Sequence, residues 1–374
     1  MAGRSDFSWI SSERSRRAKS AVAVAVSFII VLGTMGFVSW KGYSMYMDWR
    51  QQDDYIGNGD QPIEIIIEPG IGWGRVGDIL AAAEVIQDPA LFTKEALKLS
   101  DGPDAPGTYK IRTHLPAATA AAMLNDPKNL VVLTVTIPEG RRLVDIWPIL
   151  SEKLQISEED LNQVLENIKA DPTIIGLNGA AGTNPEGFLF PDTYLLHPPY
   201  ETTAVAVLGR MAAEFNSVVQ NLDLAARAEQ LGITPQQAVI VASIVEAEVN
   251  NPDDRPKAAR TIYNRLANDM LLQMDSTLHY GLGLSGQANL PLGAIDIDNP
   301  YNSYMYPGLP PTPINNPGRA ALEAALNPAE GNWLYWTTVN LETGETYFED
   351  TMEEHEEHVE MYQQWCNDHP KYSC

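Results

Sequence analysis

An uncharged run near the N-terminus constrains this chain most. Residues Ala21 to Trp40 contain no charged side chain. Twenty helical residues measure about 30 Å, which matches the hydrocarbon core of a bilayer. A cleaved signal peptide is the alternative, but the run is longer than a usual signal segment, and the sequence KGYSMYMDWR after it offers no A-x-A cleavage site. The run therefore predicts an uncleaved transmembrane helix over residues 21–40.

The charges on either side of this run predict its orientation. Residues 1–20 contain five basic and two acidic side chains, whereas the whole chain has a formal net charge of −24. Because excess basic residues stay on the cytoplasmic side, we expect a cytoplasmic N-terminus and an exported body. That body is strongly acidic, which excludes a nucleic-acid partner, since phosphates require a basic surface.

The exported part divides into segments of different character. The polar, Gly- and Pro-containing residues 41–62 predict a linker. Residues 63–138 mix strand and helix patterns, from IEIIIEPG to LVVLTVTI, and predict a small α+β module. Residues 139–365 predict a mainly helical α+β domain that ends in a β-hairpin, LYWTTVN to TYFED. Residues 366–374 form a short tail.

Three motifs raise the question of a cofactor or a metal. Gly72–Gly77 spells G-x-G-x-x-G, but an exported chain without regular βαβ alternation is not expected to bind a dinucleotide. His355 and His358 lie one helical turn apart among glutamates, where a solvated helix face is expected rather than a shielded zinc site. Cys366 and Cys374 permit a local disulfide in an exported tail. We therefore predict no cofactor and no metal.

The segment ITPQQAVIVASIVEAEVNNP predicts a buried helix with clear boundaries. Thr234 is suited to the N-cap, Pro235 to the first turn, and Gln237 completes a capping box with Thr234. Asn250 to Pro252 end the helix. Between these boundaries the sequence is apolar nearly all round, which is typical of a helix in the middle of a domain.

Two glutamates interrupt that apolar helix. At about 100° per residue, Glu246 and Glu248 point roughly 200° apart and cannot serve one site. Glu246 shares its face with small residues, so its carboxyl has room, and burial would raise its pKa toward that of a general acid. Glu248 lies at the helix end, where we expect it to reach water. The residues leave one alternative open, in which Glu246 pairs with an arginine, and the candidates are Arg255, Arg260 and Arg265.

Several segments together resemble the YceG-like (MltG-type) endolytic murein transglycosylases. They are VTIPEGRRL, PEGFLFPDTY, VASIVEAEV, RPKAARTIYNRL, LLQMDSTLHYGLG, YNSYMYPGLPPTPINNPG and WLYWTTVN. They follow the family's order over most of Ile63 to His355, and the single N-terminal apolar run also fits. The sequence departs from the family pattern at Ser276, where proline is common, and at Thr312, where glycine is usual.

The resemblance implies a membrane-anchored lyase that cuts nascent peptidoglycan glycan strands internally, between MurNAc and GlcNAc. It implies a LysM-like module at 63–138, a YceG-like catalytic domain at 139–365, and Glu246 as the catalytic acid/base. One carboxyl suffices because the sugar's own 6-hydroxyl attacks C1 and leaves a 1,6-anhydroMurNAc end, whereas ordinary glycosidases use two carboxylates. The expected partners are glycan strands, the cytoplasmic membrane and peptidoglycan synthases.

Six residues are candidates for substrate contacts. The family pattern places a loop with three of them beside the glutamate, and three more offer aromatic faces and an amide suited to N-acetyl sugars; they are Gln273, Asp275, Thr277, Tyr301, Asn302 and Tyr304. For each, the alternative is a structural role in capping or packing its loop. Glu186 in PEGFLFPDTY is expected to brace the cleft.

Two other functions stay open from the sequence. One is a hydrolase in which Asp275 supplies a second carboxylate. The other is a non-catalytic wall-binding scaffold of the cell-wall synthesis machinery.

Overall fold

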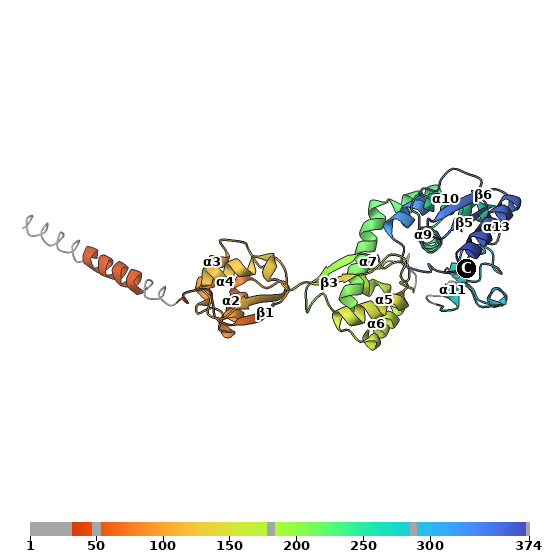
Figure 1. The fold of residues 1–374 in the computed structure, drawn as a ribbon. Helices are drawn as coiled ribbons and strands as arrows, with labels where there is room; N and C mark the ends of the chain where they lie inside the picture. The colour runs from red at the N-terminus through yellow and green to blue at the C-terminus, as the bar shows by residue number, and fades with distance from the viewer. Residues whose placement is uncertain (1–31, 47–53, 178–183, 285–289, 372–374) are drawn as a thin grey trace, which may run out of the picture. The chain divides into compact units, whose positions relative to one another are not determined.

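The computed structural model describes residues 32–46, 54–177, 184–284 and 290–371. It has a mixed α+β fold with small antiparallel sheets, as the sequence predicts for the body of the chain (Figure 1). The contacts divide it into two compact units, residues 1–130 and 131–374. We describe each unit by itself.

The predicted membrane run falls mostly outside the described residues. Residues 32–46 are helical, and Ala21 to residue 31 lie in the part that is not described. Within the described ranges, we find no helix that combines the length and the apolar character needed to cross a bilayer. The transmembrane helix therefore stays a prediction.

The first unit packs helices against a two-stranded sheet. Strands β1 (Pro62–Ile67) and β2 (Gly107–Arg112) pair antiparallel, with Pro62 opposite Arg112. Its helices are α2 (Trp73–Ala82), α3 (Pro89–Ala96), α4 (Ala117–Leu124) and the 3₁₀ turn η1 (Pro127–Asn129). Trp73 and Phe92 meet edge to face in the core, with ring centroids 5.8 Å apart.

The last strand predicted for the small module belongs to the second unit. The segment Leu130 to Ile137 forms β3 (Leu133–Thr136), which pairs antiparallel with β4 (Thr193–Leu196). The first unit accordingly ends at Leu130, and not at residue 138 as the local pattern predicts. The difference arises because strand pairing here is long-range, which a local pattern does not encode.

The second unit is mainly helical, as predicted. Its other elements are α5 (Leu143–Leu154), α6 (Glu158–Ala170), η2 (Pro172–Ile175), α7 (Ala204–Asn221), α8 (Leu224–Gln230), α9 (Pro235–Glu248), α10 (Arg255–Ala267), α11 (Asp275–Gly281), η4 (Ala294–Asp296), α12 (Arg319–Leu326), β5 (Tyr335–Asn340), β6 (Glu345–Glu349) and α13 (Met352–Asp368). The predicted C-terminal hairpin is confirmed, because β5 pairs with β6, with Tyr335 opposite Glu349.

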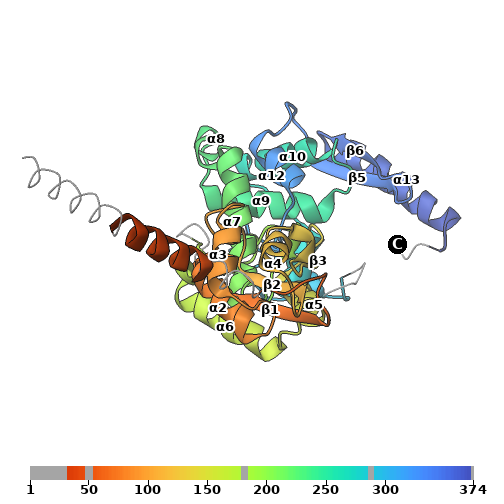
Figure 2. The same ribbon diagram turned by 90° about the vertical axis from the view of Figure 1, so that its left-hand side faces the viewer.

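Helix α9 lies in the middle of this unit and has the predicted boundaries. The Thr234 side chain accepts a hydrogen bond from the backbone N–H of Gln237 at 3.2 Å, and the Gln237 side chain accepts one from Thr234 at 2.8 Å. This capping box stabilises the first turn. Every residue from Ala238 to Val245 is buried, and α9 contacts α11 as well as α8, α10 and α12. Figure 2 shows α8, α10 and α12 beside α9.

Helix α13 packs on the hairpin through its two histidines. The buried Glu349 side chain approaches His358 Nδ1 at 2.8 Å and His355 Nδ1 at 3.6 Å. The expectation of a solvated face therefore holds for the exposed glutamates around them, and it is wrong for the two imidazoles. The described residues contain no group of three or more His, Cys, Asp or Glu side chains that could hold a metal ion. Cys366 is disulfide-bonded, and the other cysteine, Cys374, lies outside the described residues.

Candidate active site

Glu246 forms a bidentate ion pair with Arg255. Arg255 Nη2 donates to Glu246 Oε1 at 2.8 Å and Nη1 to Oε2 at 3.3 Å, and the two side chains are only 8% and 7% exposed. The backbone N–H of Gly318 donates to Oε2 at 3.0 Å. Burial raises the pKa of Glu246, while Arg255 and the Gly318 N–H lower it. The Arg255 guanidinium in bidentate contact favours the ionised form of the Glu246 carboxyl. Through its bonds to Arg255 and Gly318, Glu246 also connects α9 to α10 and to the start of α12.

The arginine pairing that the sequence left open is thus observed, with Arg255 as the partner. Such a carboxylate has both oxygens occupied by donors. Direct contact with the guanidinium opposes the protonation that a general acid needs, while burial, the larger influence, raises the pKa of Glu246. The geometry therefore gives Glu246 a structural contact, and its assignment as the catalytic acid stays a prediction.

Glu248 faces a different environment at the end of α9. The backbone N–H of Ser276, in the first turn of α11, donates to Glu248 Oε1 at 3.4 Å. Glu248 forms no ion pair with any residue that the structure describes. Burial is the largest influence and raises the pKa of the Glu248 carboxyl. The hydrogen bonds from Ser276 lower this pKa, the charge of Asp275 raises it, and His279 lowers it.

Glu248 is partly exposed, so the expectation that it reaches water holds in part, although burial raises the pKa of its carboxyl. Helix α11 packs against α9 and brings the Ser276 N–H to the carboxyl group, which a helical projection of α9 alone cannot show. A desolvated carboxyl without a contacting cation keeps its proton at higher pH than usual. That is the state a general acid requires.

Two of the predicted substrate residues lie next to Glu248. Tyr304 donates its hydroxyl to Asp275 Oδ1 at 2.5 Å. The charge of Asp275 raises the pKa of Glu248. The pKa of Tyr304 is raised chiefly by burial, next by the hydrogen bond to Asp275, and further by the charge of Glu248. Asp275 is exposed and Tyr304 is partly exposed, so both can meet a ligand.

Gln273 belongs to the same loop. Its backbone has a positive φ of 50°, and its N–H donates to Ser303 O at 3.0 Å. This bond fixes the loop, while the Gln273 side chain is exposed and remains available to a ligand. The structure thus brings Gln273, Asp275 and Tyr304 together on the loops that adjoin Glu248.

Thr277 and Asn302 have structural roles, contrary to their prediction as substrate contacts. Thr277 is fully buried, and its hydroxyl bonds Met274 O at 2.8 Å and Ser303 Oγ at 2.9 Å. Asn302 is also fully buried; its amide donates to Ile295 O and Ile297 O and accepts from the N–H of Tyr304. Both side chains use their polar groups to shape the loops that carry Tyr304 and Asp275.

Tyr301 lies in another cluster of the same unit. Its hydroxyl hydrogen-bonds Thr312 Oγ1 at 2.8 Å, and its ring centroid is 4.9 Å from that of Tyr280. Tyr301 is partly exposed, so its prediction as a sugar contact stays a prediction. Thr312, which stands where the family usually has glycine, holds the Tyr301 phenol in place.

Glu186 is a third buried carboxyl and acts as a brace, in agreement with the expectation. It accepts from the backbone N–H of Leu143 at 3.1 Å and from Asn316 Nδ2 at 3.1 Å. Burial raises the pKa of Glu186 to about 8. This carboxyl links the start of α5 to the segment before α12 from inside the protein, where it is 3% exposed.

Sequence reasoning missed the groups around Glu248. Ser276 and His279 follow Asp275 on the first turns of α11, at the spacing that brings them to one helix face. The signal was present in LLQMDSTLHYGLG, where polar residues recur along a short helix. The sequence could not show which glutamate this helix covers.

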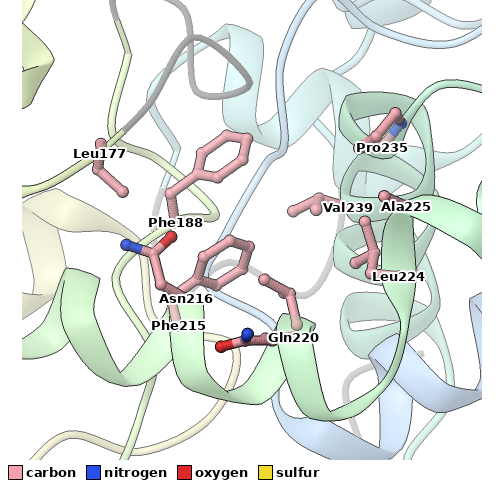
Figure 3. A pocket seen from close by; sticks show the side chains of 10 residues that line it. Leu177, Phe188, Phe215, Asn216, Gln220, Leu224, Ala225, Pro235 and Val239 are labelled. Atoms are coloured by element: carbon pink, nitrogen blue, oxygen red, sulfur yellow. The ribbon is translucent and has the colours of Figure 1, made fainter.

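One cavity lies elsewhere in the second unit. It has a volume of about 560 Å³ and is mostly apolar, and Figure 3 shows the side chains that converge on it; its lining residues are Leu177, Phe188, Phe215, Asn216, Val219, Gln220, Leu224, Ala225, Pro235 and Val239. It meets α9 at Pro235 and Val239, in the N-terminal half of the helix, whereas Glu248 ends the helix. None of these lining side chains is titratable.

A desolvated carboxyl with a raised pKa, beside the exposed Asp275 and the partly exposed Tyr304, defines a site suited to general acid–base chemistry. The YceG-like family model matches residues 65–361, and the chain belongs to this family. This match covers both units.

Similar proteins are known from several bacteria. The endolytic murein transglycosylase of Bacillus subtilis strain 168 is 26% identical over 310 residues, which cover 80% of this chain and 84% of that protein. The endolytic murein transglycosylase of Streptococcus pneumoniae strain R6 is 26% identical over 364 residues and 90% of this chain, which spans 64% of that relative's length. A crystal structure of a YceG-like protein from Listeria monocytogenes is similar with a TM-score of 0.53 and 26% identity, over 80% of this chain and 99% of that one.

Proposed function

We propose that this chain is an endolytic lytic transglycosylase of peptidoglycan. It cleaves nascent glycan strands internally, between MurNAc and GlcNAc, forms 1,6-anhydroMurNAc ends and so terminates strand elongation. Membership of the YceG-like family and the names of the curated relatives support the reaction class. The observation that carries the assignment within this chain is the Glu248 carboxyl, which is desolvated, contacted by no cation among the described residues, and adjoined by the loops of Asp275 and Tyr304.

Glu248, rather than Glu246, acts as the acid and then the base. Its O–H bond breaks, the proton passes to the glycosidic oxygen, and the bond from C1 of MurNAc to that oxygen breaks. The Glu248 carboxylate then takes the proton of the MurNAc 6-hydroxyl as O6 bonds to C1. Glu248 thus gives up one proton and regains another, and no water is consumed.

The neighbouring residues orient the sugar and set the acidity of Glu248. The negative charge of Asp275 disfavours a second carboxylate nearby, which raises the pKa of Glu248 and helps it keep its proton. The Tyr304–Asp275 hydrogen bond of 2.5 Å holds these two groups in register. Gln273 offers an exposed amide to the hydroxyl or N-acetyl groups of the strand.

A hydrolase remains the second candidate because Asp275 is a second carboxylate close to Glu248. In such an enzyme Asp275 would activate a water or attack C1 directly. The product distinguishes the two reactions, since hydrolysis leaves a reducing end.

We also propose where the enzyme works. The uncharged run Ala21 to Trp40 would anchor the chain once in the cytoplasmic membrane, with the N-terminus in the cytoplasm and the catalytic domain outside. A LysM-like role for the first unit and an association with peptidoglycan synthases follow from the family resemblance. This location would bring the site to newly made strands.

The reaction is tested with the full chain in detergent micelles and uncrosslinked glycan strands. We expect mass spectrometry to detect new 1,6-anhydroMurNAc ends, and chromatography to show early loss of long strands, which marks internal cleavage. Glu248→Gln should abolish both signals. Normal cleavage by Glu248→Gln would remove this residue from the mechanism, and the absence of cleavage by the folded wild type would support a scaffold.

A further inference from the structure

Tyr306 and Asp298 form an exposed tyrosine–carboxylate pair on the loop that also carries Tyr304. The Tyr306 hydroxyl donates to Asp298 Oδ1 at 2.6 Å. The Tyr304 hydroxyl donates to Asp275 Oδ1 in the same way at 2.5 Å. Tyr306 is 43% exposed, and Asp298 is exposed as well. The loop thus presents a second pair of the kind that adjoins Glu248, two residues further along the chain.

The backbone of this loop is fixed from inside by Asn302. This side chain is fully buried, and its amide donates to Ile295 O at 2.9 Å and to Ile297 O at 2.8 Å. The backbone N–H groups of Met305 and Tyr306 donate to Asn302 O at 3.0 Å and 2.9 Å. Ile297 and Met305, which adjoin the pair in the sequence, are nevertheless 43% and 45% exposed. A well-bonded loop that displays apolar side chains is typical of a binding surface.

Both groups of the pair have surface left for a ligand. Within the described part of the chain, no aromatic ring or cation stacks on the Tyr306 ring, and the Asp298 carboxylate makes no hydrogen bond or ion pair beyond the one with Tyr306. A carboxylate offers about four acceptor positions, of which the Tyr306 hydroxyl takes one. The pair of Tyr347 and Glu345 on the β5–β6 hairpin differs, because the Tyr347 ring is stacked on His358 with the ring centroids 4.2 Å apart.

We propose that Tyr306 and Asp298 form a further sugar subsite, which binds a GlcNAc residue of the glycan strand beside the Tyr304–Asp275 pair. This inference rests on the proposed function. The apolar C–H face of the sugar packs on the Tyr306 ring, and the second Asp298 oxygen accepts a sugar hydroxyl. Hydrogen bonds to a charged acceptor are stronger than those between neutral groups. Internal cleavage requires sugars bound on both sides of the cut bond, so a strand held at Tyr304 continues onto the neighbouring surface.

The charge of the loop favours GlcNAc over MurNAc. Residues 290–318 contain two acidic side chains, the exposed Asp296 and Asp298, and no lysine or arginine. GlcNAc is uncharged and keeps its 3- and 6-hydroxyls free in the strand, whereas O3 of MurNAc carries a lactyl group with its stem peptide. The same negative charge disfavours an anionic membrane surface, which attracts basic segments. A sugar with free hydroxyls and an apolar face meets both groups of the pair.

The test places 3-fluorotyrosine at position 306 of the full chain in detergent micelles and follows its ¹⁹F resonance. Chitotetraose, an oligomer of GlcNAc, is the probe, and 3-fluorotyrosine at position 347 is the matched control. We expect chitotetraose to shift the resonance at position 306 and to leave the one at position 347 unchanged. This signal is local, so sugar binding by the first unit does not produce it. Asp298→Asn should weaken the binding seen at position 306 about fivefold, because a neutral acceptor replaces a charged one.

Cleavage kinetics give a second readout. Tyr306→Ala should raise KM for uncrosslinked glycan strands about tenfold with little change in kcat, whereas Tyr347→Ala should change neither quantity. Absence of a shift at position 306 in folded protein, or equal shifts at positions 306 and 347, would overturn the subsite. The proposed function fails separately, if folded wild-type protein does not cleave glycan strands, whatever the resonance at position 306 does.

Discussion

Glu246 and Glu248 lie two residues apart on α9, yet among the residues that the structure describes only Glu246 is paired with an arginine. Glu246 meets Arg255 at 2.8 Å, and Glu248 meets the Ser276 N–H at 3.4 Å. Both carboxyls are desolvated, so the contacting cation is what separates a structural carboxylate from a candidate acid.

Substitution of the two glutamates should therefore have opposite effects. Glu248→Gln should lose at least a thousandfold in turnover, because general acid and base are one group, and its melting temperature should stay near wild type or rise. Glu246→Gln leaves Arg255 buried without its counter-charge and should lose about 3 kcal/mol of folding stability. Its remaining folded fraction should cleave normally. Thermal unfolding and single-turnover assays on both variants check this pair, and equal loss of activity in folded samples would contradict it.

The pH dependence should report the raised pKa of Glu248. The protonated acid starts the reaction, so kcat/KM should fall as the pH rises through that pKa. Asp275→Asn removes a charge that raises this pKa, so the decline should begin at lower pH while substantial turnover is kept. A pH profile of kcat/KM for wild type and Asp275→Asn measures the shift. Complete inactivity of folded Asp275→Asn would favour a hydrolase with two essential carboxylates.

Glu186 should make folding stability depend on pH. Its pKa is about 8 in the folded protein and 4.5 for an unperturbed carboxyl, so between these pH values the folded state holds a proton that the unfolded chain has released. The contribution is full below pH 4.5 and is lost as the pH rises toward 8, with a slope of up to about 1.4 kcal/mol per pH unit.

Glu186→Gln should flatten this part of the profile. The glutamine oxygen can still accept from Leu143 N–H and Asn316, so the variant should be more stable than wild type at pH 8. Urea unfolding at several pH values checks the slope. Glu152→Gln, at an exposed position, is the control and should keep the wild-type slope. A wild-type slope in Glu186→Gln would show that another group titrates.

The N-terminal segment should anchor the chain in the membrane with its N-terminus inside. Alkaline phosphatase folds to an active form outside the cytoplasm, so its fusion after Asp60 should be active and its fusion after Ser20 inactive. These two positions flank the uncharged run Ala21 to Trp40. Activity in the Ser20 fusion alone would reverse the predicted topology.

Local signals made part of this structure predictable. The boundaries of α9 follow from Thr234, Pro235 and Gln237, whose capping box forms as predicted. The β5–β6 hairpin follows from its alternating pattern. Such features depend on interactions between residues that are close together in the sequence, so the local pattern predicts them.

The identity of the acid could not be predicted in the same way. A helical projection shows that Glu246 and Glu248 point apart, but not that Arg255 lies on one side and α11 on the other. Likewise, the Asn302 side-chain amide donates hydrogen bonds to the backbone carbonyls of Ile295 and Ile297 in its own loop. This loop geometry exists only after folding, so the sequence does not reveal that the amide is occupied. The strand β3 finds its partner β4 far along the chain for the same reason.

The central claim is that Glu248 gives its proton to the leaving oxygen and regains one from the MurNAc 6-hydroxyl, so that no water enters the bond. Digestion of uncrosslinked glycan strands in H₂¹⁸O, followed by mass spectrometry of the new MurNAc ends, tests it most directly. We expect 1,6-anhydro ends without ¹⁸O in the wild type, and no new ends in Glu248→Gln. Incorporation of ¹⁸O at C1 of MurNAc in most of the product would contradict the claim and show a hydrolase.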